Sequence, residues 1–247
     1  MVSTVLQRLD LADRVAVDPA RSLRVEGFAD DTIVRRTLER LAEEAGTAPA
    51  WRARIWKKIP VAAGLGGGSS DAATALRLAN GLLADPLPSE RLRPLAAELG
   101  ADVPFFLTAG PQLGEGDGSE LTQLELPQDY WVVLLLPRAA HKPSTAAVYA
   151  DFDDRNGAGG YAERRRRLLD GLASVRRPRD LADLPPNDLA ASPIADELRA
   201  LGAFRADVTG AGPVVYGLFH HRADARAAGR ALRGRGRLWI TVPAWYG

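Results

Sequence analysis

Glycines followed by two serines form the part of this sequence whose residue types could hold an anion. Residues 64–68 read Gly-Leu-Gly-Gly-Gly, and Ser69 and Ser70 follow at the start of an apolar periodicity typical of a helix. Glycines let the backbone approach a ligand without Cβ atoms in the way, and a helix start presents unpaired N–H groups with a partial positive charge. These are the requirements for holding phosphate. The alternative is a flexible turn whose Ser69 or Ser70 caps the helix.

Two familiar phosphate-binding motifs do not match this stretch. It lacks the Gly-Lys-Ser/Thr ending of a Walker A sequence. It also lacks the glycine spacing of a dinucleotide-binding fingerprint and the acidic residue that such a fingerprint has about twenty residues further on. A phosphate site at this turn therefore belongs to another class.

The turn must be positioned by the strand before it and the helix after it. Residues 52–59 mix apolar and basic side chains, which predicts a half-exposed strand that ends at the following proline, because proline cannot donate to a ladder. Apolar residues recur at steps of three and four over 69–83, which predicts a helix. The same period predicts helices over 33–45 and 92–99, and Pro94 implies a kink or a later start in the second of these.

The second half of the chain shows a further alternation of strands and helices. Strands are predicted over 131–136, 214–219 and 238–242, and helices over 161–169 and 223–232. The order strand, helix, strand predicts an α+β fold in which helices cover one side of each sheet. A boundary within residues 129–144 divides the chain into two lobes, taken as 1–137 and 138–247, with a cleft between them as the natural ligand site.

Composition and charge exclude several classes of protein. The 247 residues are 46% hydrophobic and 26% charged, which is typical of a soluble globular protein and argues against disorder. A net charge of +1 provides no global field that would attract nucleic acid or an anionic membrane. No segment approaches the roughly 18 uninterrupted apolar residues of a membrane span. We find no targeting segment and expect a cytoplasmic protein.

Side chains that commonly hold metals or form disulfides are scarce. The chain has no cysteine, which excludes disulfides, thiol catalysis and thiolate metal sites. Its three histidines are His141, His220 and His221, and no third ligand lies at a useful spacing from the adjacent pair. We therefore expect no zinc or iron site built from protein ligands.

The glycine stretch closely resembles the central motif of the GHMP kinase superfamily. That motif is Pro-x-x-x-Gly-Leu-Gly-Gly-Gly-Ser-Ser followed by Asn or Asp and Ala, and residues 60–72 match it. Residues 100–106, Gly-Ala-Asp-Val-Pro-Phe-Phe, resemble a block of the 4-diphosphocytidyl-2-C-methyl-D-erythritol kinase family within that superfamily. Further segments resemble that family over 114–120, 143–149 and 186–189, and residues 209–213 resemble the third motif of the superfamily, all in the family's order along the chain.

The resemblance implies a two-lobed GHMP kinase fold and a small-molecule substrate. It implies ATP-dependent phosphorylation of a hydroxyl of 4-diphosphocytidyl-2-C-methyl-D-erythritol, in non-mevalonate isoprenoid precursor synthesis, with ATP and Mg²⁺ as cofactors. The nucleotide would be held by Ala62, Ala63, Gly64, Leu65, Gly66, Gly67, Gly68, Ser69, Ser70 and Asp71. The substrate end of the cleft would be lined by Thr209, Gly210, Ala211 and Gly212.

The resemblance also gives roles to single side chains. It implies that Asp102 is the catalytic base toward the substrate hydroxyl, and that Ser70 contacts a phosphate-bound Mg²⁺. From the residues alone, Asp102 is more simply the cap of a short helix that begins near Pro104. Asp31 stands where the family tends to have Asn near the adenine, and it is equally a cap of the helix over 33–45.

The sequence departs from the family pattern at its start. Family members begin with a strand that carries a lysine paired with the catalytic Asp, followed by a Tyr-His pair that holds the cytosine, and this chain starts inside a later segment. We therefore expect the N-terminal lobe to be truncated at its first strand, which lowers the rate and leaves a sheet edge open to self-association as a homodimer. Lys57 and Lys58 are expected to face solvent rather than to replace that lysine.

Two other functions are compatible with these motifs. One is a catalytically silent GHMP homologue that keeps the glycine turn for nucleotide binding. The other is a GHMP kinase that acts on another small alcohol, such as mevalonate, homoserine or a sugar. The segments beyond the shared glycine turn favour the cytidyl substrate over these alternatives.

Overall fold

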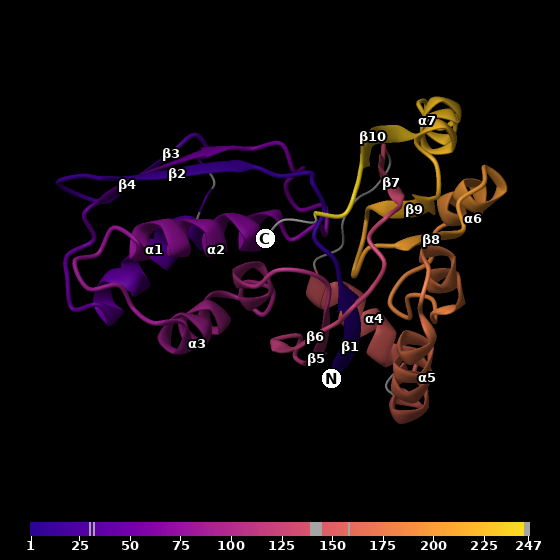
Figure 1. The fold of residues 1–247 in the computed structure, drawn as a ribbon, viewed down its shortest axis with the longest axis horizontal. Helices are drawn as coiled ribbons and strands as arrows, with labels where there is room; N and C mark the ends of the chain where they lie inside the picture. The colour runs from indigo at the N-terminus through magenta and orange to yellow at the C-terminus, as the bar shows by residue number, and fades with distance from the viewer. Residues whose placement is uncertain (30, 32, 139–144, 158, 245–247) are drawn as a thin grey trace.

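The computed structural model describes residues 1–29, 31, 33–138, 145–157 and 159–244. Its strands are β1 (Val2–Leu6), β2 (Arg14–Pro19), β3 (Arg24–Glu26), β4 (Trp51–Trp56), β5 (Gln112–Gly116), β6 (Glu120–Gln123), β7 (Trp131–Pro137), β8 (Arg205–Val208), β9 (Val215–Phe219) and β10 (Gly236–Thr241). Its helices are α1 (Ile33–Glu44), α2 (Gly67–Asn80), α3 (Ser89–Leu99), α4 (Thr145–Asp154), α5 (Tyr161–Ser174), α6 (Pro193–Ala200) and α7 (Arg222–Ala231), with 3-10 helices η1 (Pro104–Leu107) and η2 (Pro178–Asp183). The strands form three sheets, ordered β2-β4-β3, β1-β5-β6 and β10-β7-β9-β8, which follow one another across the molecule (Figure 1).

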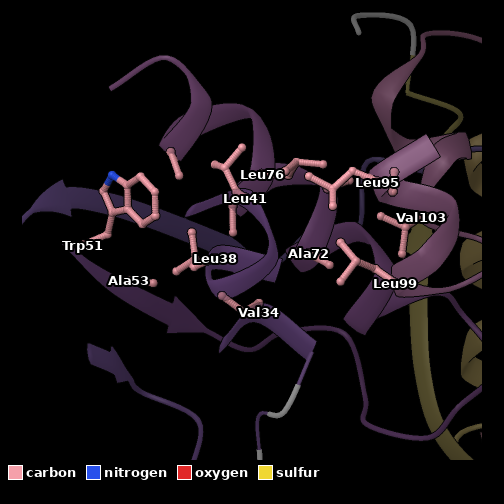
Figure 2. Packing of buried hydrophobic residues seen from close by; sticks show 14 of the residues in the cluster. Val34, Leu38, Leu41, Trp51, Ala53, Ala72, Leu76, Leu95, Leu99 and Val103 are labelled. Carbon is pink, nitrogen blue, oxygen red and sulfur yellow. The ribbon is translucent and has the colours of Figure 1, made fainter. Parts of the chain in front are cut away.

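Helices α1 and α2 lie under the sheet β2-β4-β3, and the first core fills the space between these elements (Figure 1). The side chains of Val34, Leu38 and Leu41 recur at helical steps on α1 and are fully buried. They meet Leu76 of α2 and Trp51 of β4 in one cluster, as Figure 2 shows. Each such side chain contributes about 1.5 to 3 kcal/mol by leaving water, so this cluster fixes α2 and the turn that precedes it.

The sheet β10-β7-β9-β8 has apolar residues buried on both faces. Val133 and Leu135 of β7 pack in one cluster with α6 and α7. The alternate residues Val132 and Leu134 pack in another cluster with Leu172 of α5 and residues of the central sheet. The prediction that helices cover only one side of each sheet is therefore wrong here. The cause is visible in β7, whose successive apolar residues have no polar alternation and so need a cover on both faces.

The central sheet β1-β5-β6 lies between the two other sheets, and β1 forms one of its edges. Tyr161 of α5 covers part of that edge, because its hydroxyl donates to the carbonyl oxygen of Val2 at 3.0 Å and lies 2.8 Å from the Ser3 hydroxyl. The C-terminal segment returns to the first half of the chain. There Asp10 donates its N–H to the carbonyl of Val242 and Ala244 donates to that of Arg8.

Most predicted elements are confirmed as α1, α2, α3, α5, α7, β7, β9 and β10, with shifts of a few residues at their ends. Two differ in a way that has a physical reason. The strand predicted over 52–59 ends at Trp56, because the N–H groups of Lys58 and Ile59 donate to the Asp13 carboxylate instead of to a ladder. Helix α3 begins before Pro94 and contains it, so the predicted later start is wrong.

The division of the chain at residue 137 stays a prediction. The pairings show that β7, the last strand before that division, belongs to the sheet formed by strands of the second half. In the part of the chain that the structure describes, no helix is both long and apolar enough to cross a bilayer.

Candidate functional site

The glycine turn connects the segment after β4 to α2 in a backbone conformation that favours glycine. Gly64 and Gly66 have φ of 73° and 65°, and Ala62 has φ of 56°. A residue with a Cβ is strained by about 1 to 2 kcal/mol in this left-handed region, so the conformation favours glycine at 64 and 66, while Ala62 carries that strain. The turn is held from one side by Ala63, which is 2% exposed and packs with Val214 in a core cluster.

The start of α2 presents free backbone N–H groups next to this turn. The N-terminal cap is Gly66, no side chain caps the helix, and the first helical bond runs from Ser70 N–H to the carbonyl of Gly66 at 2.8 Å. The alternative that Ser69 or Ser70 caps the helix is therefore wrong, since both lie inside α2. The N–H groups of Gly67, Gly68 and Ser69 precede the first intrahelical bond, and they carry the positive end of the helix dipole.

Two further segments touch the turn closely, one of them through a backbone atom that leaves no room for a Cβ at Gly64. A Cβ on Gly64 would lie 2.4 Å from the carbonyl oxygen of Gly212, and a Cβ on Gly66 would lie 3.0 Å from the ring of Phe106. Gly212 ends the 209–212 turn, which is closed by a 2.7 Å hydrogen bond from its N–H to the carbonyl of Thr209. The structure thus brings together the glycine turn, the 209–212 turn and the 100–106 block.

Asp102 lies in a turn at the start of that block, with the Val103 N–H donating to the carbonyl of Gly100 at 3.0 Å. No side chain caps the following η1 helix, so the alternative that Asp102 is a helix cap is wrong. Asp102 is exposed to solvent as a residue, while nearby protein atoms partly desolvate its carboxylate and raise its pKa above the usual value. Partial burial of the Tyr149 hydroxyl, and after it the negative charge of Asp102, raise the pKa of Tyr149 on α4. Among the described residues, no cation pairs with Asp102.

The prediction that Lys57 faces solvent is wrong. Its ammonium group donates to the carboxylates of both Asp13 and Asp71, the latter at 2.7 Å. The side chains of Lys57, Asp13 and Asp71 are only 17%, 1% and 5% exposed. The prediction was wrong because carboxylates from two other parts of the chain neutralise the ammonium group and make its burial tolerable.

The cluster of Asp13, Lys57 and Asp71 joins the two sides of the glycine turn. Asp13 accepts the N–H groups of the residues just before the turn, and Asp71 belongs to the second turn of α2. Burial and the neighbouring Asp13 raise the pKa of Asp71 to about 6 although Lys57 lowers it. Burial lowers the pKa of Lys57, but its hydrogen bonds to both carboxylates raise it above the usual value. The Asp71 carboxylate therefore points into this cluster. Of the rest of the predicted nucleotide-binding set, residues 62–66 form the turn and residues 67–70 begin α2.

Asp31 caps α1. Its two carboxylate oxygens accept the N–H groups of Val34 and Arg35, each at 3.1 Å. This confirms the capping role that the sequence allowed.

The residues at the turn fit a polyphosphate by their donor chemistry. Three free N–H groups and two serine hydroxyls lie within 67–70, and neither hydroxyl has a hydrogen-bond partner among the residues that the structure describes. Glycines at 64 and 66 let the turn pack directly against Gly212 and the Phe106 ring. No group of three or more His, Asp or Glu side chains gathers to hold a metal ion anywhere in the described ranges. A divalent cation here would therefore depend on the phosphates for most of its ligands.

Sequence reasoning missed three residues that the fold places at this site. Asp13 gave no local signal, because its partners lie far along the chain. Phe106 and Tyr149 both lie in segments that the sequence singled out, 100–106 and 143–149, but nothing in their types predicted a contact with Gly66 or proximity to Asp102. Residues 139–144, including His141 and the first two residues of the 143–149 segment, lie outside the described residues.

Comparison with known proteins gives the same class as the geometry. The model of the GHMP kinases N terminal domain matches residues 32–110, and that of the GHMP kinases C terminal domain matches residues 189–238. The chain is 37% identical to a 4-diphosphocytidyl-2-C-methyl-D-erythritol kinase of Geobacter sulfurreducens, over 94% of this chain and 85% of the relative. It is also 37% identical to one from Anaeromyxobacter sp. strain K, over 95% of this chain and 78% of the relative.

Solved structures agree with this. A crystal structure of 4-(cytidine 5'-diphospho)-2C-methyl-D-erythritol kinase matches with a TM-score of 0.78 and 30% identity, over 98% of this chain and 90% of that one. The mevalonate kinase of Methanococcus jannaschii matches with a TM-score of 0.79 at 13% identity, over 98% of this chain and 92% of that one, which shows a shared fold alone.

The chain belongs to the GHMP kinase family, a family of small-molecule kinases that use ATP. Within that family, it is similar to the 4-diphosphocytidyl-2-C-methyl-D-erythritol kinases named above.

Proposed function

We propose that this chain transfers the γ-phosphoryl group of ATP to a hydroxyl of 4-diphosphocytidyl-2-C-methyl-D-erythritol. The observation that carries the proposal is the meeting of three sequence segments at one point. Gly64 contacts the 209–212 turn, and Gly66 contacts Phe106 in the block that contains Asp102. Support for the particular substrate comes from relatives that carry this enzyme's name at 37% identity over most of both chains.

Each part of the site has a role in this reaction. The N–H groups of Gly67, Gly68 and Ser69 would hold phosphate oxygens of ATP, and Ser70 would contact a phosphate-bound Mg²⁺. Bound ATP supplies the phosphoryl group, and Mg²⁺ neutralises its charge. Asp102 accepts the proton of the attacking hydroxyl, and the raised pKa makes its carboxylate a stronger base. The 209–212 turn lies opposite the glycine turn, where its small residues allow a substrate close to the backbone.

A substrate panel tests this proposal. The purified chain is incubated with ATP, Mg²⁺ and one alcohol at a time, namely 4-diphosphocytidyl-2-C-methyl-D-erythritol, mevalonate or homoserine, and product formation is followed by mass spectrometry. We expect kcat/KM for the cytidyl substrate to exceed the others by about 10⁴-fold, since a site built to hydrogen-bond one substrate rejects analogues that leave its polar groups unpaired. Preference for another alcohol contradicts the proposal. ATP binding without phosphorylation of any of the three indicates a catalytically silent homologue.

A further inference from the structure

Asn187 belongs to a sequence motif to which the proposed reaction gives no role, yet it holds one wall of the site. Its side-chain amide donates both hydrogens, one to the carbonyl of Val208 at 3.0 Å and one to that of Gly210 at 2.7 Å. Its side-chain oxygen accepts the N–H of Leu189 at 2.8 Å. Asparagine has two amide donors and one carbonyl acceptor, so every polar group of this side chain is engaged.

These bonds determine where the 209–212 turn lies. The two carbonyls that Asn187 holds belong to the residues on either side of Thr209, so both peptide planes at the entry to the turn are fixed. Thr209 in turn accepts the N–H of Gly212 at 2.7 Å. The carbonyl oxygen of Gly212 is the atom that approaches Gly64 most closely. A continuous series of contacts therefore runs from the Asn187 amide to the glycine turn.

The segment around Asn187 is itself held by further polar contacts. The backbone N–H of Asn187 donates to the carboxylate of Asp207 at 2.8 Å, and the side chain of Asp207 is 10% exposed. The neighbouring Asp188 pairs with Arg164 of α5 at 2.8 Å. Asn187 is thus tied to β8 through Asp207, and its segment is tied to α5, before its side chain reaches the turn.

We propose that Asn187 is a positioning residue that sets the 209–212 turn against the glycine turn and so determines how tightly ATP is held and how it is presented to the acceptor hydroxyl. It acts through Gly212 and Gly64. This inference deepens the proposed function and rests on it for the acceptor, while its ATP-binding part rests only on the contact between the two turns.

Asn187→Asp is the sharpest test. It keeps the size of the side chain and the oxygen that accepts the Leu189 N–H. It replaces the NH2 group, which donates to two carbonyl oxygens, by an oxygen that repels them. Asn80→Asp is the matched control. Asn80 is also buried, at 7% exposed, and it also bridges a backbone N–H and a carbonyl, those of Leu87, but at the far end of α2. Both variants lose amide donors to main-chain carbonyls, and only one of them touches the site.

We expect Asn187→Asp to raise the Kd for ATP, measured by calorimetry, by about tenfold, because the two hydrogen bonds that position the 209–212 turn are lost and the new carboxylate oxygen repels both carbonyls. We expect kcat/KM to fall by at least as much. Asn80→Asp lowers the melting temperature and leaves both quantities at their original values. If Asn187→Asp does not fold, Asn187→Ala, which removes the donors without adding a repulsive oxygen, serves in its place with a smaller rise in Kd.

The proposal is overturned if a folded Asn187 variant binds ATP and turns over like the original chain, or if Asn80→Asp loses as much ATP affinity. The outcome is separable from that of the proposed function. If the original chain binds ATP but does not phosphorylate the cytidyl substrate, the proposed reaction is contradicted. The ratio of the Kd for ATP of the Asn187 variant to that of the original chain still decides the role of Asn187.

Discussion

Replacing Asp102 with asparagine lowers kcat for the cytidyl substrate by about 10²- to 10⁴-fold, which is the usual contribution of a general base. The amide has the size of the carboxylate but cannot take up the hydroxyl proton. The affinity for ATP stays close to its original value, because Asp102 lies outside the glycine turn and, among the described residues, neither caps a helix nor forms an ion pair. Steady-state kinetics and calorimetric titration with ATP measure the two quantities separately.

The dependence of kcat/KM on pH tests the role of Asp102 as the base a second time. A base works only when ionised, so kcat/KM of the original chain falls as pH drops through the pKa of Asp102. Burial raises that pKa, so the fall comes at a higher pH than an exposed aspartate would give. An Asp102→Asn variant that keeps the original kcat, or the original acidic limb, contradicts the assignment of Asp102 as the base.

Replacing Gly64 with alanine lowers kcat/KM by about a hundredfold, the usual cost of misplacing a reacting group by about 1 Å. The added methyl group would lie 2.4 Å from the carbonyl oxygen and 3.1 Å from the carbonyl carbon of Gly212, both of them backbone atoms that cannot rotate away. The glycine turn and the 209–212 turn must therefore separate. We expect the Kd for ATP to rise together with the loss of kcat/KM, measured on the same preparation.

Gly46→Ala is the control for this variant. Gly46 also has a positive φ, of 63°, and a Cβ placed there meets nothing within 4 Å. It therefore suffers the left-handed strain of about 1 to 2 kcal/mol without any clash. We expect Gly46→Ala to lower the melting temperature and to leave ATP binding unchanged. Equal losses of ATP affinity in the two variants would mean that strain or general instability, rather than the contact between the two turns, explains the effect at Gly64.

Much of the fold could be predicted from the sequence because burial imposes a period on it. The apolar residues of α1 and α2 recur at helical steps since one face of each helix enters the core. Whether one face or both faces of the sheet that contains β7 are buried was harder to predict. The apolar run in β7 contained the signal for a sheet buried on both sides, but the order of elements pointed to a single layer of helices.

The site was predictable where it depends on residue type and unpredictable where it depends on distant contacts. Glycines and a helix start indicate phosphate binding from local chemistry alone. The approach of Gly64 to Gly212 joins segments from opposite halves of the chain, and no periodicity reports it. Lys57 shows the same limit. A lysine beside a strand is normally solvated, and only the fold brings Asp13 and Asp71 to its ammonium group.

The central claim is that the glycine turn holds the phosphates of ATP and presents them to a hydroxyl beside Asp102. A crystal structure of this chain with Mg²⁺, the non-hydrolysable analogue AMP-PNP and 4-diphosphocytidyl-2-C-methyl-D-erythritol tests it most directly. We expect phosphate oxygens within about 3 Å of the N–H groups of Gly67, Gly68 and Ser69, with the acceptor hydroxyl at the same distance from the Asp102 carboxylate. A triphosphate bound elsewhere, or a hydroxyl out of reach of Asp102, contradicts it.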